Sequence, residues 1–187
     1  MNSTFEAFQA RATAVSAEVH RFPDREAALA FLLPFLREAG VGPGPRDGAV
    51  WVPGSFLQGL SLADLAAQVP GLAFDVTRDG AEAARVGISQ MDAGVAATGT
   101  LVQDASAVEK RLASTLPPIH VAIVPTHRVV ASLGEVLETL RPEALAYVAC
   151  ITGPSRTADI ERVLTIGVHG PERLVILAVD SLEQEVA

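Results

Sequence analysis

Apolar residues in the first part of the chain recur at the spacing of amphipathic helices. Separations of three and four residues place five of them on one face of a helix over residues 3–20: Phe5, Phe8, Ala12, Val15 and Val19. A second helix is expected over residues 24–38, with the aspartate at its first position as N-cap. The turn-rich segment GVGPGPRDG follows at 40–48. We therefore expect a helical arm over residues 1–40, connected to a larger unit over residues 41–187.

The rest of the chain alternates short apolar runs with helical segments. Seven runs have the length of strands: 49–52, 72–77, 84–89, 93–102, 119–124, 145–151 and 173–179. The later runs are continuous rather than alternating, which is typical of strands buried on both faces of a parallel sheet. Helices are expected after two capping boxes, at 61–64 and 132–135, and over 157–166. These patterns predict a Rossmann-like, doubly wound α/β fold with a largely parallel sheet and an N-terminal helical extension.

The composition limits the classes of function. Hydrophobic residues make up 49% of the 187 residues, yet no apolar run reaches the roughly 20 residues that a membrane-spanning helix needs. The N-terminus lacks a basic start followed by an apolar stretch, so we expect a soluble protein of the cytoplasm. A formal net charge of −8, without clustered Lys and Arg, argues against a nucleic-acid backbone as partner.

Cysteine and histidine are too sparse for the usual metal centres. The single cysteine, Cys150, lies in an apolar run, and an iron–sulfur cluster typically takes four thiolates. Four histidines lack the spacing of metal ligands: His20, His120, His127 and His169. We therefore expect that this chain binds no metal and no cofactor.

The turn GPSRT at 153–157 follows the apolar run at 145–151. In a parallel sheet, ligands bind beyond the carboxyl ends of the strands, where the next helix presents its N-terminus. Turn formation and helix capping account for Gly153, Ser155 and Thr157 of this turn and for Asp159 just after it. They do not account for Arg156, because a cation opposes the helix dipole there. Either an anionic ligand or a carboxylate of the protein itself would stabilise this guanidinium.

Two further loops carry candidate groups for ligand binding. His169 precedes Gly170 and either bonds the last carbonyls of a helix or serves as a proton donor or acceptor in the same cleft. Thr98, Gly99 and Thr100 follow small residues and leave room for a ligand to approach the backbone. A β-bulge or a tight hairpin is the structural alternative for this second loop.

Three blocks of the sequence, in this order, resemble the LUD-domain family, and in particular its small LutC-like lactate-utilization members. The blocks are GIS-x(8)-TGTLV at 87–102, LPPIHVAIVP at 116–125 and GPSRTADIERVLTIGVHGPERL at 153–174. The resemblance implies a fold like that of the sugar-phosphate isomerase and CoA-transferase superfamily. It also implies a component of L-lactate oxidation to pyruvate, whose partner proteins carry iron–sulfur clusters.

The resemblance also suggests roles for the loop residues. Arg156 would bind a small anion, the backbone amides of Ser155 and Thr157 would share it, and His169 would assist proton movement. Many members of the family carry Glu immediately before the Thr-Gly-Thr segment, whereas this chain has Ala97. If a carboxylate at this position performs acid/base or covalent chemistry, as one does in CoA transferases of similar fold, this chain lacks it.

Two other classes of function remain open from the sequence. One is an independent CoA-transferase-like or sugar-phosphate-acting enzyme, for which Asp92 is the nearest available carboxylate before the Thr-Gly-Thr segment. The other is a non-catalytic interaction module, with the amphipathic arm over residues 1–40 as its docking surface.

Overall fold

Six parallel strands form the central sheet of the computed structural model, which describes residues 3–141, 145–158, 164–166 and 169–182. Their order across the sheet is β1-β12-β7-β4-β2-β3. The strands are β1 (Glu18–Asp24), β12 (Arg173–Ser181), β7 (Ile119–Pro125), β4 (Ala84–Gln90), β2 (Gly48–Trp51) and β3 (Leu72–Ala73). Every neighbouring pair is parallel, so the carboxyl ends of all six strands lie at one edge of the sheet. The predicted α/β fold with a largely parallel sheet is confirmed.

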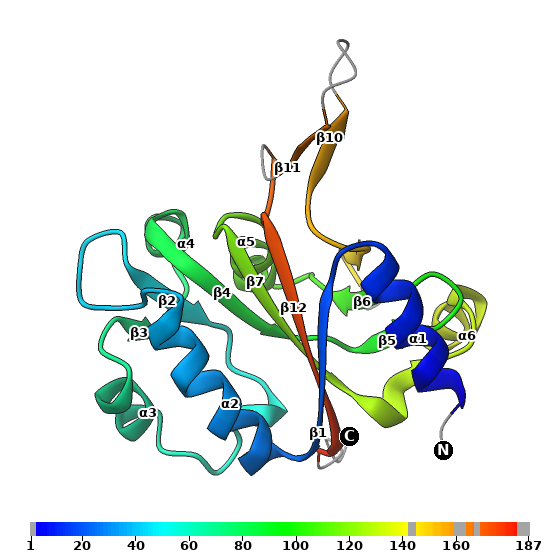
Figure 1. The fold of residues 1–187 in the computed structure, drawn as a ribbon, viewed down its shortest axis with the longest axis horizontal. Helices are drawn as coiled ribbons and strands as arrows, with labels where there is room; N and C mark the ends of the chain where they lie inside the picture. The colour runs from blue at the N-terminus through cyan, green and yellow to red at the C-terminus, as the bar shows by residue number, and fades with distance from the viewer. Residues whose placement is uncertain (1–2, 142–144, 159–163, 167–168, 183–187) are drawn as a thin grey trace.

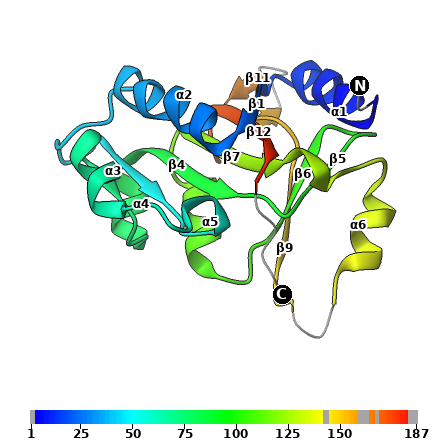
Figure 2. The same cartoon turned by 90° about the horizontal axis from the view of Figure 1, so that it is seen from below.

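Helices and a second sheet cover the two faces of the central sheet (Figures 1 and 2). Helices α2 (Arg25–Glu38) and α3 (Leu62–Gln68) and the short helix η1 (Ser55–Leu57) pack on one face. Helix α1 (Ser3–Ala14) packs on the other, beside the second sheet and α6 (Leu133–Thr139). The remaining helices are α4 (Arg78–Ala83), α5 (Val108–Thr115) and the short η2 (Thr126–Arg128).

The continuous apolar runs are explained by burial on both faces. In β7, Val121 and Ile123 pack into the core under α2, whereas Ala122 and Val124 pack into the core under α1. Successive side chains of a strand point to opposite faces, so a strand covered on both sides has no solvent-facing position to fill with polar residues.

The second sheet has the order β8-β5-β6-β9 and is mostly antiparallel. Its strands are β8 (Val129–Val130), β5 (Ala93–Val95), β6 (Thr100–Asp104) and β9 (Val148–Ile151). The single strand expected over 93–102 is therefore wrong. Residues 96–99 form the turn of a β5–β6 hairpin, which was the structural alternative for the Thr-Gly-Thr segment. The strand expected over 145–151 is also corrected, because β9 pairs antiparallel with β6 outside the central sheet.

The described residues of the helix expected over 157–166 are strands, and residues 159–163 lie outside the described residues. Strands β10 (Arg156–Ala158) and β11 (Leu164–Ile166) pair antiparallel there and form a two-stranded hairpin. In Figure 1 these strands project from the body beyond the amino end of β12. The capping pattern of Ser155, Thr157 and Asp159 was misleading, and strands of three residues are too short to show a period of two.

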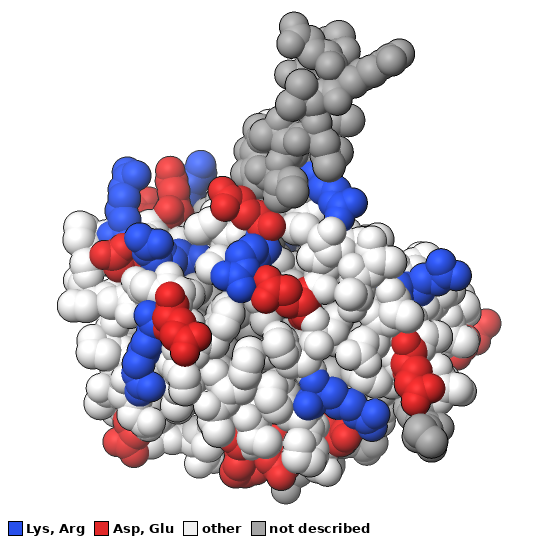
Figure 3. Space-filling view, in the orientation of Figure 1, with Lys and Arg blue, Asp and Glu red and all other residues white. Residues whose placement is uncertain are grey.

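The helix expected over 3–20 ends at Ala14, and Ser16 adopts a positive φ of 71°. The chain then forms β1, an edge strand that the helical spacing concealed. Charged pairs tie it to β12: Arg21 lies 2.9 Å from Asp180, and Arg173 lies 2.9 Å from Glu18. Basic and acidic side chains are interspersed over the face in Figure 3.

The helix caps expected from the sequence are largely confirmed. Asp24 accepts a 2.8 Å hydrogen bond from the Ala27 amide at the start of α2. Ser132 and Glu135 form both bonds of a capping box at α6. Ser61 caps α3 through the Asp64 amide. Helices α4 and α5 were not predicted, because each is shorter than three turns and leaves little periodic signal.

Candidate functional site

Two of the loops singled out in the sequence converge on the turn that joins α1 to β1. Gly99, in the β5–β6 turn, and Gly153, after β9, both have positive φ angles, of 68° and 71°. A Cβ atom on Gly99 would collide with the backbone of Ala12, and one on Gly153 with the carbonyl of Val15. Both loops therefore touch the same stretch of backbone at the end of α1, which only glycine permits.

A row of threonine hydroxyls connects these loops. The Oγ1 atoms of Thr98 and Thr100 lie 2.7 Å apart, and those of Thr100 and Thr152 lie 2.8 Å apart. Thr100 is buried in the middle of the row, whereas Thr98 and Thr152 are exposed at its ends. A hydroxyl both donates and accepts, so the exposed ends are able to bind a polar ligand.

Arg156 is the first residue of β10 and not part of a helix N-terminus. Its Nη2 atom donates to the carbonyl of Val15 at 2.8 Å and lies 2.5 Å from the hydroxyl of Ser16. Because Arg156 begins a strand, no helix dipole opposes this cation, and that expectation is wrong. The bonds that fix Arg156 instead join the hairpin to the α1–β1 turn.

The position of these loops relative to the central sheet is also corrected. The α1–β1 turn precedes β1, and the hairpin leads into β12, so both lie at the amino-terminal edge of the central sheet. GPSRT was expected at the carboxyl edge, on the premise that the preceding strand belongs to the parallel sheet. We name this group of residues the amino-edge loops: Thr98, Gly99, Thr100, Thr152, Gly153, Ser155, Arg156, His169 and Gly170.

The loop with His169 lies beside the loop with Ser155. The Ser155 amide donates to the carbonyl of Pro171 at 2.8 Å, and Gly170 lies against the side chain of Ser155. His169 is exposed. Thr157 belongs to β10, where its backbone is opposite Thr165. The remaining predicted residue, Asp159, lies outside the described residues.

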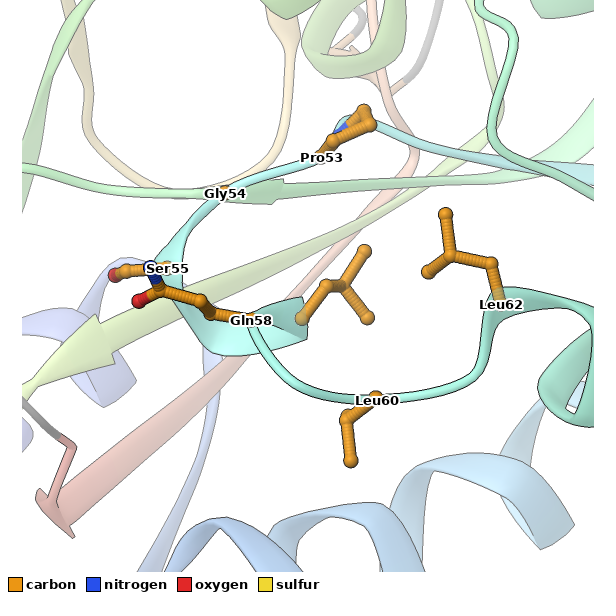
Figure 4. Close-up of a pocket in the computed structure, with 7 residues that line it drawn as sticks. Pro53, Gly54, Ser55, Gln58, Leu60 and Leu62 are labelled. Atoms are coloured by element: carbon orange, nitrogen blue, oxygen red, sulfur yellow. The ribbon is translucent and has the colours of Figure 1, made fainter.

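At the opposite, carboxyl edge of the sheet, three hollows lined by described residues meet at Ser55. The largest encloses about 350 Å³ and is lined by Pro53, Gly54, Ser55, Leu57, Gln58, Leu60 and Leu62 (Figure 4). A second, of about 130 Å³, is lined by Val52, Pro53, Gly54, Ser55, Gln90, Asp92 and Lys110. A third, of about 140 Å³, is lined by Arg25, Glu26, Ser55, Ser181 and Leu182. Open α/β sheets bind ligands at this edge.

Gln90, the last residue of β4, fixes the geometry at Ser55. Its Oε1 atom accepts from the Phe56 amide at 2.9 Å, and its Nε2 atom donates to the hydroxyl oxygen of Ser55 at 2.7 Å. The two bonds define which way the Gln90 amide faces. Ser55 accepts from Gln90, and among the described residues its own O–H donates to no acceptor.

Asp92 and Lys110 add ionisable groups to the second hollow. Burial raises the pKa of the Asp92 carboxyl above the usual aspartate value, and the Asp104 amide and the Lys110 ammonium act in the opposite direction. The Asp92 side chain nevertheless reaches solvent at the mouth of the hollow. In contrast, hydrogen bonds from Ser106 lower the pKa of Asp104.

The described residues define no metal centre and no membrane span. No three or more His, Cys, Asp or Glu side chains among them are arranged to coordinate a metal ion. None of the helices in the described ranges combines the length and apolar character needed to cross a bilayer.

The parallel sheet, helices on both of its faces and hollows at its carboxyl edge define a Rossmann-like α/β protein. The family model of the LUD domain matches residues 5–179, and the chain belongs to this family. A solved structure agrees with the fold: a DUF162 family protein from Deinococcus radiodurans superimposes with a TM-score of 0.65 at 19% identity, covering 95% of this chain and 96% of that one.

Curated relatives are similar over part of their length. Lactate utilization protein C of Macrococcus caseolyticus is 37% identical over 106 residues, which cover 54% of this chain and 46% of the relative. The protein of the same name from Bacillus subtilis is 36% identical over 108 residues, 53% of this chain and 44% of the relative. Each match therefore covers less than half of the relative.

The residues of the carboxyl-edge hollows were missed in the sequence analysis, apart from Asp92. A signal for them was present. The segment Pro53–Ser55 follows the strand expected over 49–52, and Gln90 follows the strand expected over 84–89. Lys110 gave no local signal, because it comes from α5, a helix that was not predicted.

Proposed function

We propose that this chain is a cytoplasmic component of a lactate-utilization system. The observation that carries the proposal is its 36% to 37% identity to lactate utilization proteins C, within a LUD domain that spans most of the chain. In this proposal, L-lactate is oxidised to pyruvate by a complex whose iron–sulfur clusters belong to partner proteins. The single thiol of Cys150 fits a chain that binds no cluster of its own.

The amino-edge loops are the proposed binding site for a small anion such as the carboxylate of lactate or pyruvate. The two hydrogen bonds that Arg156 makes with described residues both use Nη2, and a guanidinium has five N–H donors in a planar fork that suits a carboxylate. The exposed hydroxyl of Thr98 and the side chain of Ser155 lie on neighbouring loops, whereas the Ser155 amide is already bonded to the carbonyl of Pro171. His169, at the base of the hairpin, is the proposed proton carrier.

Growth on lactate tests the role in the cell. A strain without the gene is expected to lose growth on L-lactate as sole carbon source and to grow normally on glucose, and re-expression is expected to restore growth. Undiminished growth on L-lactate in the deleted strain would contradict the proposed role.

Calorimetric titration of the purified chain with L-lactate and pyruvate tests the binding site. Replacing Arg156→Ala removes charge-assisted bonds, so the affinity is expected to fall by about 10- to 100-fold. Arg156→Lys is expected to retain part of it. The matched control is Arg78→Ala, at an exposed residue of α4, with unchanged affinity. If Arg156→Ala and the unaltered chain bind equally well, and both have native circular dichroism, the proposed anion site is contradicted.

A further inference from the structure

We infer that the carboxyl edge binds a monocarboxylate with an apolar chain, at a site centred on Ser55 and separate from the amino-edge loops. The inference does not depend on the lactate role. It rests on the meeting of a polar and an apolar hollow at one serine whose hydroxyl hydrogen is available to a ligand.

Ser55 and Lys110 supply the donors for the ligand's carboxylate. The hydroxyl oxygen of Ser55 is engaged as an acceptor by Gln90 at 2.7 Å, which directs the Ser55 O–H away from that amide. Lys110 lines the same hollow and is the only lysine among the 14 Lys and Arg residues of the chain. A hydroxyl and an ammonium together match the two oxygens of one carboxylate.

Asp92 restricts the charge of the ligand. Asp92 and Lys110 line the same polar hollow. When Asp92 is ionised, its negative charge offsets the positive charge of the Lys110 ammonium. A monoanion placed against Lys110 is compatible with this arrangement. A phosphate, which carries up to two negative charges near neutral pH, would be repelled more strongly by an ionised Asp92.

Three leucines form the binding site for the apolar chain: Leu57 at the end of η1, Leu60 in the segment that follows, and Leu62 at the start of α3. The larger hollow shares Pro53, Gly54 and Ser55 with the polar one and continues along Leu57, Leu60 and Leu62. Figure 4 shows Pro53, Leu60 and Leu62 around this hollow, with the polar ends of Ser55 and Gln58 together at one side. A ligand with its carboxylate at Ser55 therefore extends its chain over the leucines.

Gly54 sits where the two hollows join. A Cβ atom at this position would lie 3.1 Å from Oε1 of Gln90, which is the atom that accepts from the Phe56 amide. Glycine thus lets the backbone pass close to the amide that orients Ser55.

The test is a calorimetric titration of the full chain with acetate, butyrate, hexanoate and octanoate. Burial of each added methylene is expected to tighten binding by up to about fourfold. Lys110→Gln is expected to weaken binding of every member by about tenfold or more. Leu62→Gln is expected to flatten the dependence on chain length and to leave acetate binding unchanged. The control, Arg78→Gln, leaves all affinities unchanged.

Three outcomes would overturn the inference. They are affinities that do not change with chain length, unchanged binding by Lys110→Gln, and hexyl phosphate that binds more tightly than hexanoate. The result is separable from the lactate proposal, because Arg156→Ala is expected to leave hexanoate binding intact and Lys110→Gln is expected to leave lactate binding intact.

Discussion

His120 is a buried histidine whose role cannot be read from its neighbours in the sequence. Its side chain is fully buried, and its Nε2 atom lies 2.9 Å from the hydroxyl of Ser89 on the adjacent strand β4. Nδ1 has no hydrogen-bond partner among the described residues. Burial lowers the pKa of His120 from 6.5 to about 4, so the ring is neutral at physiological pH.

This pKa predicts a loss of stability in mild acid. Between pH 6.5 and about 4 the unfolded chain binds a proton at His120 that the folded protein does not, so the stabilisation is complete above 6.5 and declines as the pH falls. The expected loss from this residue between about pH 7.5 and pH 5 is roughly 2 kcal/mol. Urea unfolding at both pH values should show a smaller loss in His120→Gln, and an equal loss would contradict the assignment.

Helix α1 and the β5–β6 hairpin illustrate how contacts between elements constrain single positions. The turn at Gly99 is in contact with the backbone at the end of α1. The buried Phe5, Phe8 and Ala12 pack this helix into the core on its side of the central sheet. A positive φ does not by itself indicate such a contact. Gly59 has a φ of 77°, but a methyl group added there would meet no atom within 4 Å beyond its chain neighbours. Gly59 therefore shares the backbone conformation of Gly99 without the crowding.

Alanine substitutions at the two glycines therefore distinguish the cost of a left-handed backbone from the cost of a steric clash with α1. Gly59→Ala is expected to cost about 1 kcal/mol of unfolding free energy, from the left-handed backbone alone. Gly99→Ala is expected to cost at least about 2 kcal/mol more, because α1 or the turn must also move. Chemical unfolding of both variants measures the difference. Similar losses would mean that α1 is not packed against the turn as described.

The N-terminal residues contribute to both cores of the protein. Ala28, Leu32 and Leu36 of α2 are fully buried under one face of the central sheet, and Phe5 and Phe8 of α1 are buried under the other. Strand β1 extends the central sheet beside β12. Residues 1–40 therefore supply part of the sheet and part of the covering of each face.

Deletion of residues 1–40 is expected to prevent folding of the remainder. Residues 41–187 alone would expose the apolar faces of β12 and β7 and leave β12 as an unprotected edge. Circular dichroism and urea unfolding should show no cooperative transition for this fragment. A cooperative transition comparable to that of the full chain would instead support a separable N-terminal arm.

The secondary structure was predictable where a segment was long and its pattern was unambiguous. The helix over 24–38 and the apolar strands at 119–124 and 173–179 are present close to their expected bounds. The prediction was wrong for short elements. Strands β10 and β11 and most of the edge strand β1 were assigned to helices, because strands of a few residues have no decisive period.

The candidate site was predictable only in part. The sequence alone indicated the α/β class, the glycines at tight turns and the polar character of the loops, because these depend on local backbone preference and on the periodicity of burial. Folding determined which edge of the sheet each loop occupies, that Arg156 reaches Val15, and that Lys110 and Ser55 line one hollow. Those relations join residues far apart in the chain, and strand order, which no local pattern encodes, sets the distances between them.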